Sequence, residues 1–128
     1  MARQSTPQTV VGKFIACINA RDARGLVALC TPAHVFVDSL GSRLSDRASL
    51  ERGWAGYFSL FPDYRIEVEG MMSDGDLVLL HGWAAATYSK TGRAWRIPAA
   101  WRALVAGELI AEWQVYADNK PVYEILGA

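Results

Sequence analysis

The sequence has few cysteines, no excess of charge of one sign and no long apolar run. Only Cys17 and Cys30 occur, both in helical patterns and without CxxC spacing. We therefore expect buried free thiols and neither a disulfide nor a metal pair. The 13 basic and 13 acidic residues cancel, whereas binding to nucleic acid or to an anionic lipid surface normally requires a basic excess. We expect neither as a partner.

Targeting and membrane signals are absent as well. Residues 1–9 are polar and lack the apolar core of a signal peptide, and no later apolar run is long and charge-free enough to span a bilayer. These features predict a cytoplasmic protein. No spacing of His, Cys, Asp and Glu resembles a metal site, so we expect no metal and no cofactor.

Apolar material is plentiful. Hydrophobic residues make up 52% of the 128 residues, which is enough for one well-buried core, and the length is typical of one domain. We therefore predict that residues 1–128 form a single domain.

Three helices are predicted in the N-terminal half. Ser5-Thr6-Pro7 is typical of a helix start, and apolar residues at helical spacing follow it up to Ile18. A second, short helix begins at the Asp22 cap and ends near Pro32. The third helix covers about 45–61, and its apolar face is rich in aromatic residues.

The remaining sequence has the pattern of strands. A short strand is predicted over 34–38, and from Tyr64 onward apolar and charged residues alternate, as in a strand with one wet face. Asp74-Gly75 is a strong hairpin signal. Three long strands follow at 77–88, 94–105 and 109–116. Helices followed by a β-meander predict an α+β fold.

The order of elements and several local sequences resemble the nuclear-transport-factor-two-like superfamily. Residues 10–29 and 37–42 are similar to bacterial ketosteroid isomerases, and residues 82–126, notably 110–119, are similar to SnoaL-like proteins. The resemblance implies a cone-like α+β fold in which about three N-terminal helices pack on a curved antiparallel sheet, mixed at one edge. Such a fold would enclose a pocket for a small hydrophobic molecule.

The resemblance also suggests catalytic positions. It places the general base of the isomerases on Asp38, but their oxyanion-binding tyrosine falls on Phe14 and their protonated aspartate falls near Ala100. Two donors are therefore missing, and we reject authentic ketosteroid isomerase activity. Cyclases and epoxide hydrolases of this fold place an acid on the last strand near a tryptophan. Here Asp118 is the only carboxylate of that strand region after Trp113.

Asp38 has two interpretations. It ends a predicted strand next to a glycine turn, where the fold would place a carboxylate at the rim of the pocket. A carboxylate held against aromatic walls would be a useful base near neutral pH. Alternatively, Asp38 forms an ordinary Asx-turn with the following Ser39-Leu40-Gly41.

Other polar candidates also have two interpretations. His81 lies in the middle of a long predicted strand, where it either contacts a ligand or is satisfied by a neighbouring side chain. Arg102 either points inward and holds an anionic ligand group or forms a surface salt bridge. Whether Arg102 faces Glu112 depends on the turn at Ala106-Gly107, and a two-residue turn would place Glu112 opposite Trp101.

Aromatic residues are the candidate walls of the pocket. They form either a ligand site or plain core: Phe14, Trp54, Phe58, Trp83 and Trp113. Trp95 and Trp101 are expected on the outer sheet face, buried against a second copy in a homodimer.

We therefore predict a cofactor-independent isomerase, cyclase or lyase in which Asp38 removes a proton next to a carbonyl. His81 or Arg102 would supply the missing oxyanion donor, and Asp118 is a further catalytic candidate. Two rivals remain: a hydrophobic-ligand-binding domain without catalysis, and a dimeric interaction module.

Overall fold

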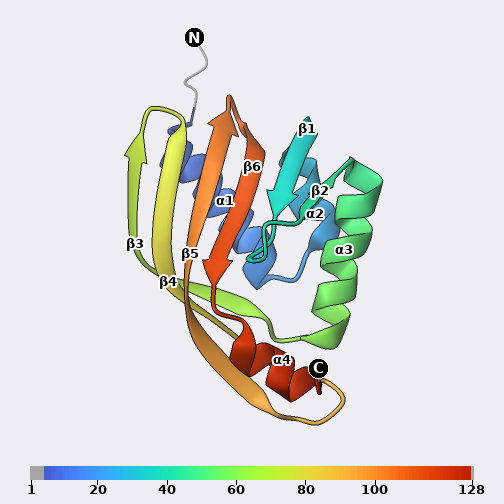
Figure 1. The fold of residues 1–128 in the computed structure, drawn as a ribbon. Coiled ribbons are helices and arrows are strands. Elements are labelled where there is room, and N and C mark those ends of the chain that lie inside the picture. Colours follow the sequence, from blue (N-terminus) through green and yellow to red (C-terminus); the bar gives the residue numbers. More distant parts are fainter. Residues whose placement is uncertain (1–4, 128) are drawn as a thin grey trace.

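The computed structural model describes residues 5–127. Their elements follow one another in the order shown in Figure 1: α1 Pro7–Asn19, α2 Ala23–Ala28, β1 Cys30–Val37, β2 Arg43–Ser45, α3 Arg47–Leu60, β3 Arg65–Asp74, β4 Leu77–Thr87, β5 Ala94–Ala106, β6 Leu109–Ala117 and α4 Lys120–Leu126. The predicted α+β class is confirmed. Two short elements, β2 and α4, lie outside the predicted set.

The six strands form one sheet in the order β2-β1-β6-β5-β4-β3. Every neighbouring pair is antiparallel except β1 and β6, which are parallel. The sheet is therefore mixed at one edge, as predicted. In Figure 1 the long strands β4 and β5 bend toward α4, and α1 lies across one face of the sheet. This curvature gives the sheet a concave side that the helices cover.

Side-chain caps fix the helix starts. Thr6 Oγ1 accepts from the Thr9 amide at α1, and Asp22 Oδ1 accepts from the Gly25 amide at α2. Asp46, with a φ of 63°, caps α3 through the Ser49 amide. Such caps satisfy amides that the first turn leaves unpaired. The predicted helix starts at Thr6 and Asp22 are thus confirmed, and α3 begins two residues after the predicted position.

Pro32 does not end a helix, contrary to the prediction. Helix α2 already stops at Ala28, and Pro32 lies inside β1, where the pairing with β6 shifts register between Cys30 and Val35. Proline has no amide to donate and is tolerated where a ladder is interrupted. The irregular pairing therefore explains why β1 begins four residues before the predicted strand.

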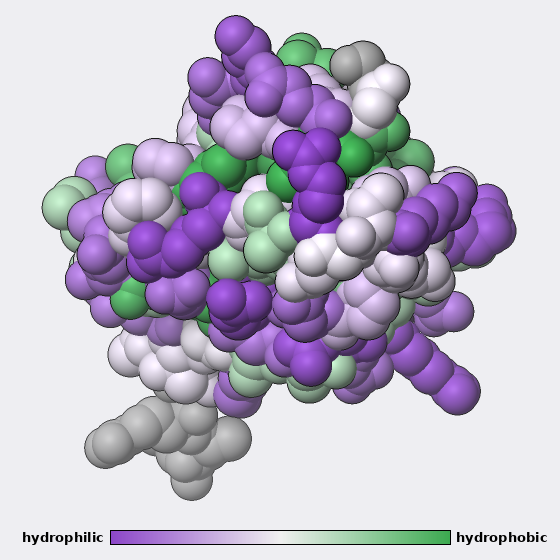
Figure 2. Space-filling view, turned by 90° about the horizontal axis from the view of Figure 1, so that it is seen from below, coloured by the Kyte–Doolittle hydropathy of each residue, from purple (hydrophilic) through white to green (hydrophobic). Residues whose placement is uncertain are grey.

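The C-terminal helix α4 lies at the lower end of the sheet in Figure 1. Pro121 is in the first turn of this helix, and the side chain of Val122, also in the helix, is buried. Seen from below, the surface is mostly polar, but apolar side chains come to the surface between polar ones (Figure 2). Within residues 5–127 no helix has the length and hydropathy needed to cross a membrane.

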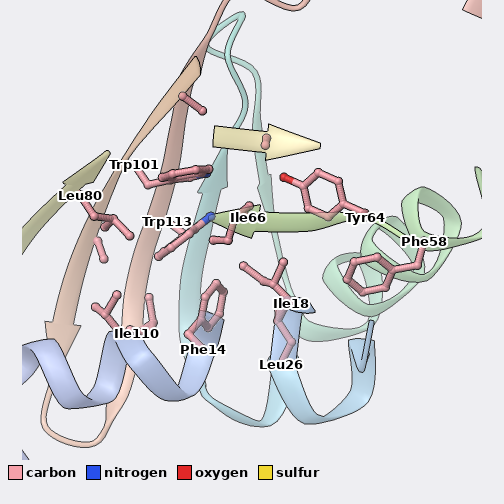
Figure 3. Close-up of a cluster of buried hydrophobic side chains, with 14 of the residues drawn as sticks. Phe14, Ile18, Leu26, Phe58, Tyr64, Ile66, Leu80, Trp101, Ile110 and Trp113 are labelled. Atoms are coloured by element: carbon pink, nitrogen blue, oxygen red, sulfur yellow. The ribbon is translucent and has the colours of Figure 1, made fainter. Parts of the chain in front are cut away.

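The core fills the space between α1 and the concave sheet face. Phe14 and Ile18 of α1 point toward Trp101 and Trp113 of the sheet (Figure 3), and the ring centroids of Phe14 and Trp113 are 4.7 Å apart. Each of these side chains is almost fully buried. Burial of one large apolar side chain stabilises a fold by about 1.5–3 kcal/mol, so this cluster fixes how α1 sits on the sheet.

Candidate functional site

A cavity of about 430 Å³ lies between α3, α4 and the concave sheet face. Its walls are mainly aromatic and come from both helices and the sheet: Phe36, Trp54, Tyr57, Phe61, Tyr64, Trp95, Trp101, Trp113 and Tyr123. A volume of this size is typical of sites for small organic molecules.

The pleat of the sheet selects the residues that reach the cavity. In β5 the inward positions alternate with outward ones, so Trp95, Ile97, Ala99 and Trp101 all contribute to the wall. Trp101 stacks on Trp113 of β6, with ring centroids 6.5 Å apart. The predicted outer position of Trp95 and Trp101 is therefore wrong: they are 7% and 2% exposed and belong to the core and the cavity wall.

Asp38 lies immediately after β1 and lines the cavity. Its Oδ1 accepts from the amides of Leu40 and Ser42, both at 2.9 Å. The carboxylate therefore makes the Asx-turn of the second interpretation. Because both bonds end on Oδ1, Oδ2 is left available, and a role in turn formation does not prevent contact with a ligand.

Two tyrosines add hydroxyl groups to the same wall. Tyr57 of α3 and Tyr64, just before β3, meet edge to face with centroids 5.0 Å apart. Burial raises the pKa of both phenols, and each is raised further by a phenol beside it, Tyr123 for Tyr57 and Tyr57 for Tyr64. Both phenols are protonated near neutral pH, as tyrosine is at its ordinary pKa, and burial makes them weaker acids still. Figure 3 shows the Tyr64 hydroxyl pointing toward Trp101 and Trp113.

Trp95 contributes a buried donor without a partner. Its indole Nε1 is buried and has no hydrogen-bond acceptor among residues 5–127. The ring packs against Phe61 and Tyr64, with centroids 5.4 and 6.1 Å away. Buried donors are normally paired, so this N–H is an exception, and with almost no accessible surface it is not offered to the cavity.

The predicted wall residues divide into three groups. Trp54 and Trp113 line the cavity. Phe14 and Phe58 are buried one layer behind it, where Phe14 contacts Trp113 and Phe58 lies 5.6 Å from the Trp54 ring. Trp83 does not reach the cavity: it is on the outer sheet face, where the Arg96 guanidinium lies 3.9 Å from its ring centre. For Trp83 the wall prediction is wrong, because β4 turns its odd positions outward.

Arg102 and Glu112 form the surface salt bridge of the second interpretation. Arg102 Nη1 lies 3.4 Å from Glu112 Oε1, and both side chains are about one third exposed on the outer face. Ala106 pairs with Leu109, so the two-residue turn is at Gly107-Glu108 and not at Ala106-Gly107, and Glu112 is not opposite Trp101. A register shift between Leu104 and Val105 then pairs Leu104 with Glu112. The extra residue of a bulge reverses which face the following side chains occupy.

His81 is exposed on the outer face. Its imidazole covers Gly70 of β3, since a Cβ at Gly70 would lie 2.4 Å from its Nε2. Neither His81 nor Arg102 lines the cavity, so neither contacts a molecule bound there.

Asp118 is outside the aromatic cavity too. It is exposed, and its Oδ1 accepts from the Lys120 amide at 3.0 Å. It lines a neighbouring recess of about 410 Å³ at the start of α4. This recess shares wall residues with the cavity: Ser39, Ala117, Asn119 and Tyr123. Asn119 Nδ2 donates to Ser39 Oγ at 2.6 Å and joins the two rims.

His34 is a buried polar residue that belongs to the core and not to the cavity wall. Its Nδ1 lies 2.7 Å from the Ile110 carbonyl oxygen, and its Nε2 has no partner among the described residues. Burial lowers the pKa of this imidazole, while the Ile110 carbonyl and Glu112 act in the opposite direction. His34 is therefore neutral in the folded protein near neutral pH.

Both cysteines are free thiols, as predicted, but only Cys30 is buried, and it begins β1 and is not in a helix, whereas Cys17 of α1 is partly exposed. Burial raises the pKa of Cys30 to about 12, with Arg47 acting in the opposite direction. A thiol with such a pKa is not a nucleophile near neutral pH. Among residues 5–127, no three His, Cys, Asp or Glu side chains form a group that could hold a metal ion.

Several wall residues were not predicted as site residues. Tyr57 was assigned to the aromatic face of its helix only, and α4, which supplies Val122, Tyr123 and Leu126, was not predicted at all. The signal for α4 is the sequence Asn119-Lys120-Pro121, since proline is favoured in the first turn of a helix.

Residues 11–113 match the family described as the SnoaL-like domain. No curated protein matches the sequence significantly.

Solved structures share the fold. IdmH of Streptomyces antibioticus, a candidate polyketide cyclase, is 23% identical, with 97% of this chain and 100% of that chain covered and a TM-score of 0.81. An NTF2-like protein of Burkholderia thailandensis is 18% identical, with 95% and 98% covered and a TM-score of 0.82. A candidate SnoaL-like polyketide cyclase of Shewanella denitrificans is 15% identical, with 94% and 96% covered and a TM-score of 0.83. At these identities the likeness concerns the fold.

Proposed function

The chain belongs to the SnoaL-like domain family, and we propose that its cavity binds a small hydrophobic carbonyl compound and acts on it without a cofactor. The observation that carries this proposal is a single carboxylate in a largely aromatic and apolar wall: Asp38 lines the cavity, and its Oδ2 is not used by the turn. The reaction class is isomerase, cyclase or lyase.

In this mechanism Asp38 takes a proton from the carbon next to the carbonyl. The C–H electrons move into the carbonyl group and give an enolate, and Asp38 becomes a neutral acid. The proton then returns to another carbon in an isomerisation. In a cyclisation the enolate carbon instead attacks a second carbonyl of the same molecule, and the proton goes to the new alkoxide.

The enolate oxygen needs donors, and the predicted ones, His81 and Arg102, do not line the cavity. We assign this role to the hydroxyls of Tyr57 and Tyr64. Both residues line the cavity, and their phenols are protonated near neutral pH and can act as neutral donors. Fixed donors in a water-poor site stabilise developing negative charge strongly. The names of two neighbours as candidate polyketide cyclases support a polyketide-like ketone as substrate.

The test is Asp38→Asn. Asparagine keeps Oδ1 for the Leu40 and Ser42 amides, so the turn survives while the base is lost. With an enolisable polyketide-like ketone, we expect ligand-induced thermal stabilisation to be retained and turnover to fall by about 10²–10⁴-fold. Glu51→Gln on the exposed side of α3 is the matched control and should change neither quantity. Equal retention of turnover in Asp38→Asn would contradict the proposal.

The second candidate is a non-catalytic binding domain. It is favoured by the two amide bonds to Asp38 Oδ1, which give the carboxylate a purely structural reason to be there. In that case the ketone would stabilise the protein and would never be turned over, in the wild type as in the variant.

A homodimer through the outer sheet face stays a prediction. The observation that favours it is a set of exposed large apolar side chains on the outward positions of β3, β4 and β6: Met72, Leu79 and Tyr116. Sedimentation velocity over a range of concentrations should show a dimer, and a monomer at every concentration would contradict it. A cytoplasmic location also stays a prediction from the sequence.

A further inference from the structure

The charge of the cavity is one-sided. Among the described residues that line it, Asp38 alone carries a formal charge, and none is Lys, Arg or His. The adjoining recess adds Asp118, Glu124 and Lys120. The two connected hollows therefore hold three acidic groups and one basic group. Clefts lined by one sign of charge concentrate ligands of the opposite sign.

Aromatic residues line the cavity beside the single carboxylate. Phe36 and Asp38 are two residues apart and both line the cavity, and Phe36 is the register partner of Trp113 in the neighbouring strand. Trp54 of α3 meets Phe36 edge to face, with centroids 5.6 Å apart. Trp113 itself is covered by Phe14 and Trp101. Phe36, Trp54 and the Asp38 carboxylate are therefore the part of this wall open to a ligand, and we call them the head site.

The chemistry of the head site fits a cation. The faces of aromatic rings carry partial negative charge and attract ammonium groups, most strongly on tryptophan and in places shielded from water. The carboxylate adds a counter-charge. An alkylated ammonium suits this wall better than a primary amine, because its alkyl groups pack against rings and it needs no hydrogen-bond acceptors. An anionic ligand would meet Asp38 with no cation to balance it.

We propose that the cavity selects ligands by charge and binds a hydrophobic tertiary or quaternary ammonium ion. The ammonium lies in the head site formed by Phe36, Trp54 and Asp38. Its apolar part extends along the wall of Trp101, whose ring stacks on Trp113. This binding goes beyond the proposed reaction and does not require it.

Three probes that share a 2-naphthylmethyl group and differ in the charge of the attached group test the charge preference by calorimetry. They are (2-naphthylmethyl)trimethylammonium, its carbon isostere 2-neopentylnaphthalene and the anion of 2-naphthaleneacetic acid. We expect the ammonium to bind at least about tenfold more tightly than the neutral isostere, and the carboxylate more weakly than either. Equal affinity of the ammonium and the isostere overturns the proposal, and so does failure of the ammonium to bind.

Two variants locate the effect. Asp38→Asn, which keeps the turn acceptor, should weaken the ammonium about tenfold and leave the neutral isostere unchanged. Trp54→Leu should weaken the ammonium more than the isostere, because leucine keeps apolar contact and lacks the aromatic face. Glu51→Gln removes a negative charge outside the cavity and should alter none of the three affinities. An unchanged ammonium affinity in Asp38→Asn overturns the head site.

These results are separable from the proposed reaction. A ketone that is turned over by the wild type and not by Asp38→Asn supports catalysis, whatever the outcome with the ammonium probe. Preferential ammonium binding without ketone turnover supports the head site and contradicts the proposed reaction.

Discussion

The inner and outer faces of β4, β5 and β6 carry different chemistry although they share the same strands. The inner face of β5 presents Trp95 and Trp101 to the cavity, whereas the outer face presents Arg96 and Arg102. On the outer face each of these arginines contacts a partner. Arg96 lies over the Trp83 ring and near Glu67, and Arg102 pairs with Glu112.

The difference shows that strand alternation sorts charge as well as hydrophobicity. Each arginine of β5 is at an even position, and each cavity residue of that strand is at an odd one. The cavity is left with no basic group among its described lining residues, and an acid enters it only from the end of β1, at Asp38. This arrangement is why the site cannot use an arginine as an anion holder.

The largest effect should come from removing one tryptophan from each face. Trp101→Ala should lower the free energy of unfolding by about 3–5 kcal/mol, because Trp101 is 2% exposed and stacks on Trp113. Trp83→Ala should cost roughly 1 kcal/mol, since it loses a partly exposed ring and its contact with Arg96. Urea denaturation measures both. Equal costs would break the comparison.

A smaller effect concerns the pH dependence of stability through His34, buried behind the inner face. Its folded pKa is lowered, so the unfolded chain takes up a proton more readily as the pH falls below the unfolded value of about 6.5. The stability given by the neutral imidazole is therefore present above that pH and is lost as the pH falls toward the folded pKa.

His34→Asn tests this, because its amide can still donate to the Ile110 carbonyl and does not titrate. Between about pH 7.5 and about pH 5, the free energy of unfolding should decrease more in the wild type than in the variant. The same fall in both proteins would show that His34 does not contribute.

The smallest effect should come from the ion pair of the outer face. A double-mutant cycle with Arg102→Gln and Glu112→Gln should give a coupling of about 0.2–1 kcal/mol in low salt, and less in high salt, because both side chains are partly solvated. A coupling of several kcal/mol would mean that the pair is buried by a partner, and it would sharpen the case for a dimer on this face.

Much of the fold followed from local patterns. Thr6 and Asp22 cap helices as predicted, and the hairpin predicted from Asp74-Gly75 is present, with Asp74 ending β3 and Gly75-Asp76 as the turn, Gly75 at φ 58°. These signals act within a few residues, so the sequence alone carries them. Two different signals predict Asp38 as a site residue. Strand periodicity places it at the end of a strand, and the family resemblance suggests its role as a base.

The facing of β5 was harder to predict because its outer positions are not all polar. Pro98, Ala100 and Leu104 alternate with the buried set and blur the period of two. The two arginines of the strand, both at even positions, indicate that the even positions face outward and the odd positions face the core. The salt bridge between Arg102 and Glu112 depended on a bulge after Leu104, and a bulge reflects tertiary fit more than local sequence.

Helix α4 contributes Val122, Tyr123 and Leu126 to the cavity yet belongs to no strand pairing, and the hydrogen bond from Asn119 to Ser39 anchors its start. The last segment of the chain therefore acts as an exchangeable lining. Replacing its apolar residues with smaller or larger ones would reshape the ligand chamber while the six-stranded scaffold stays intact, which makes this helix the natural place to engineer new selectivity.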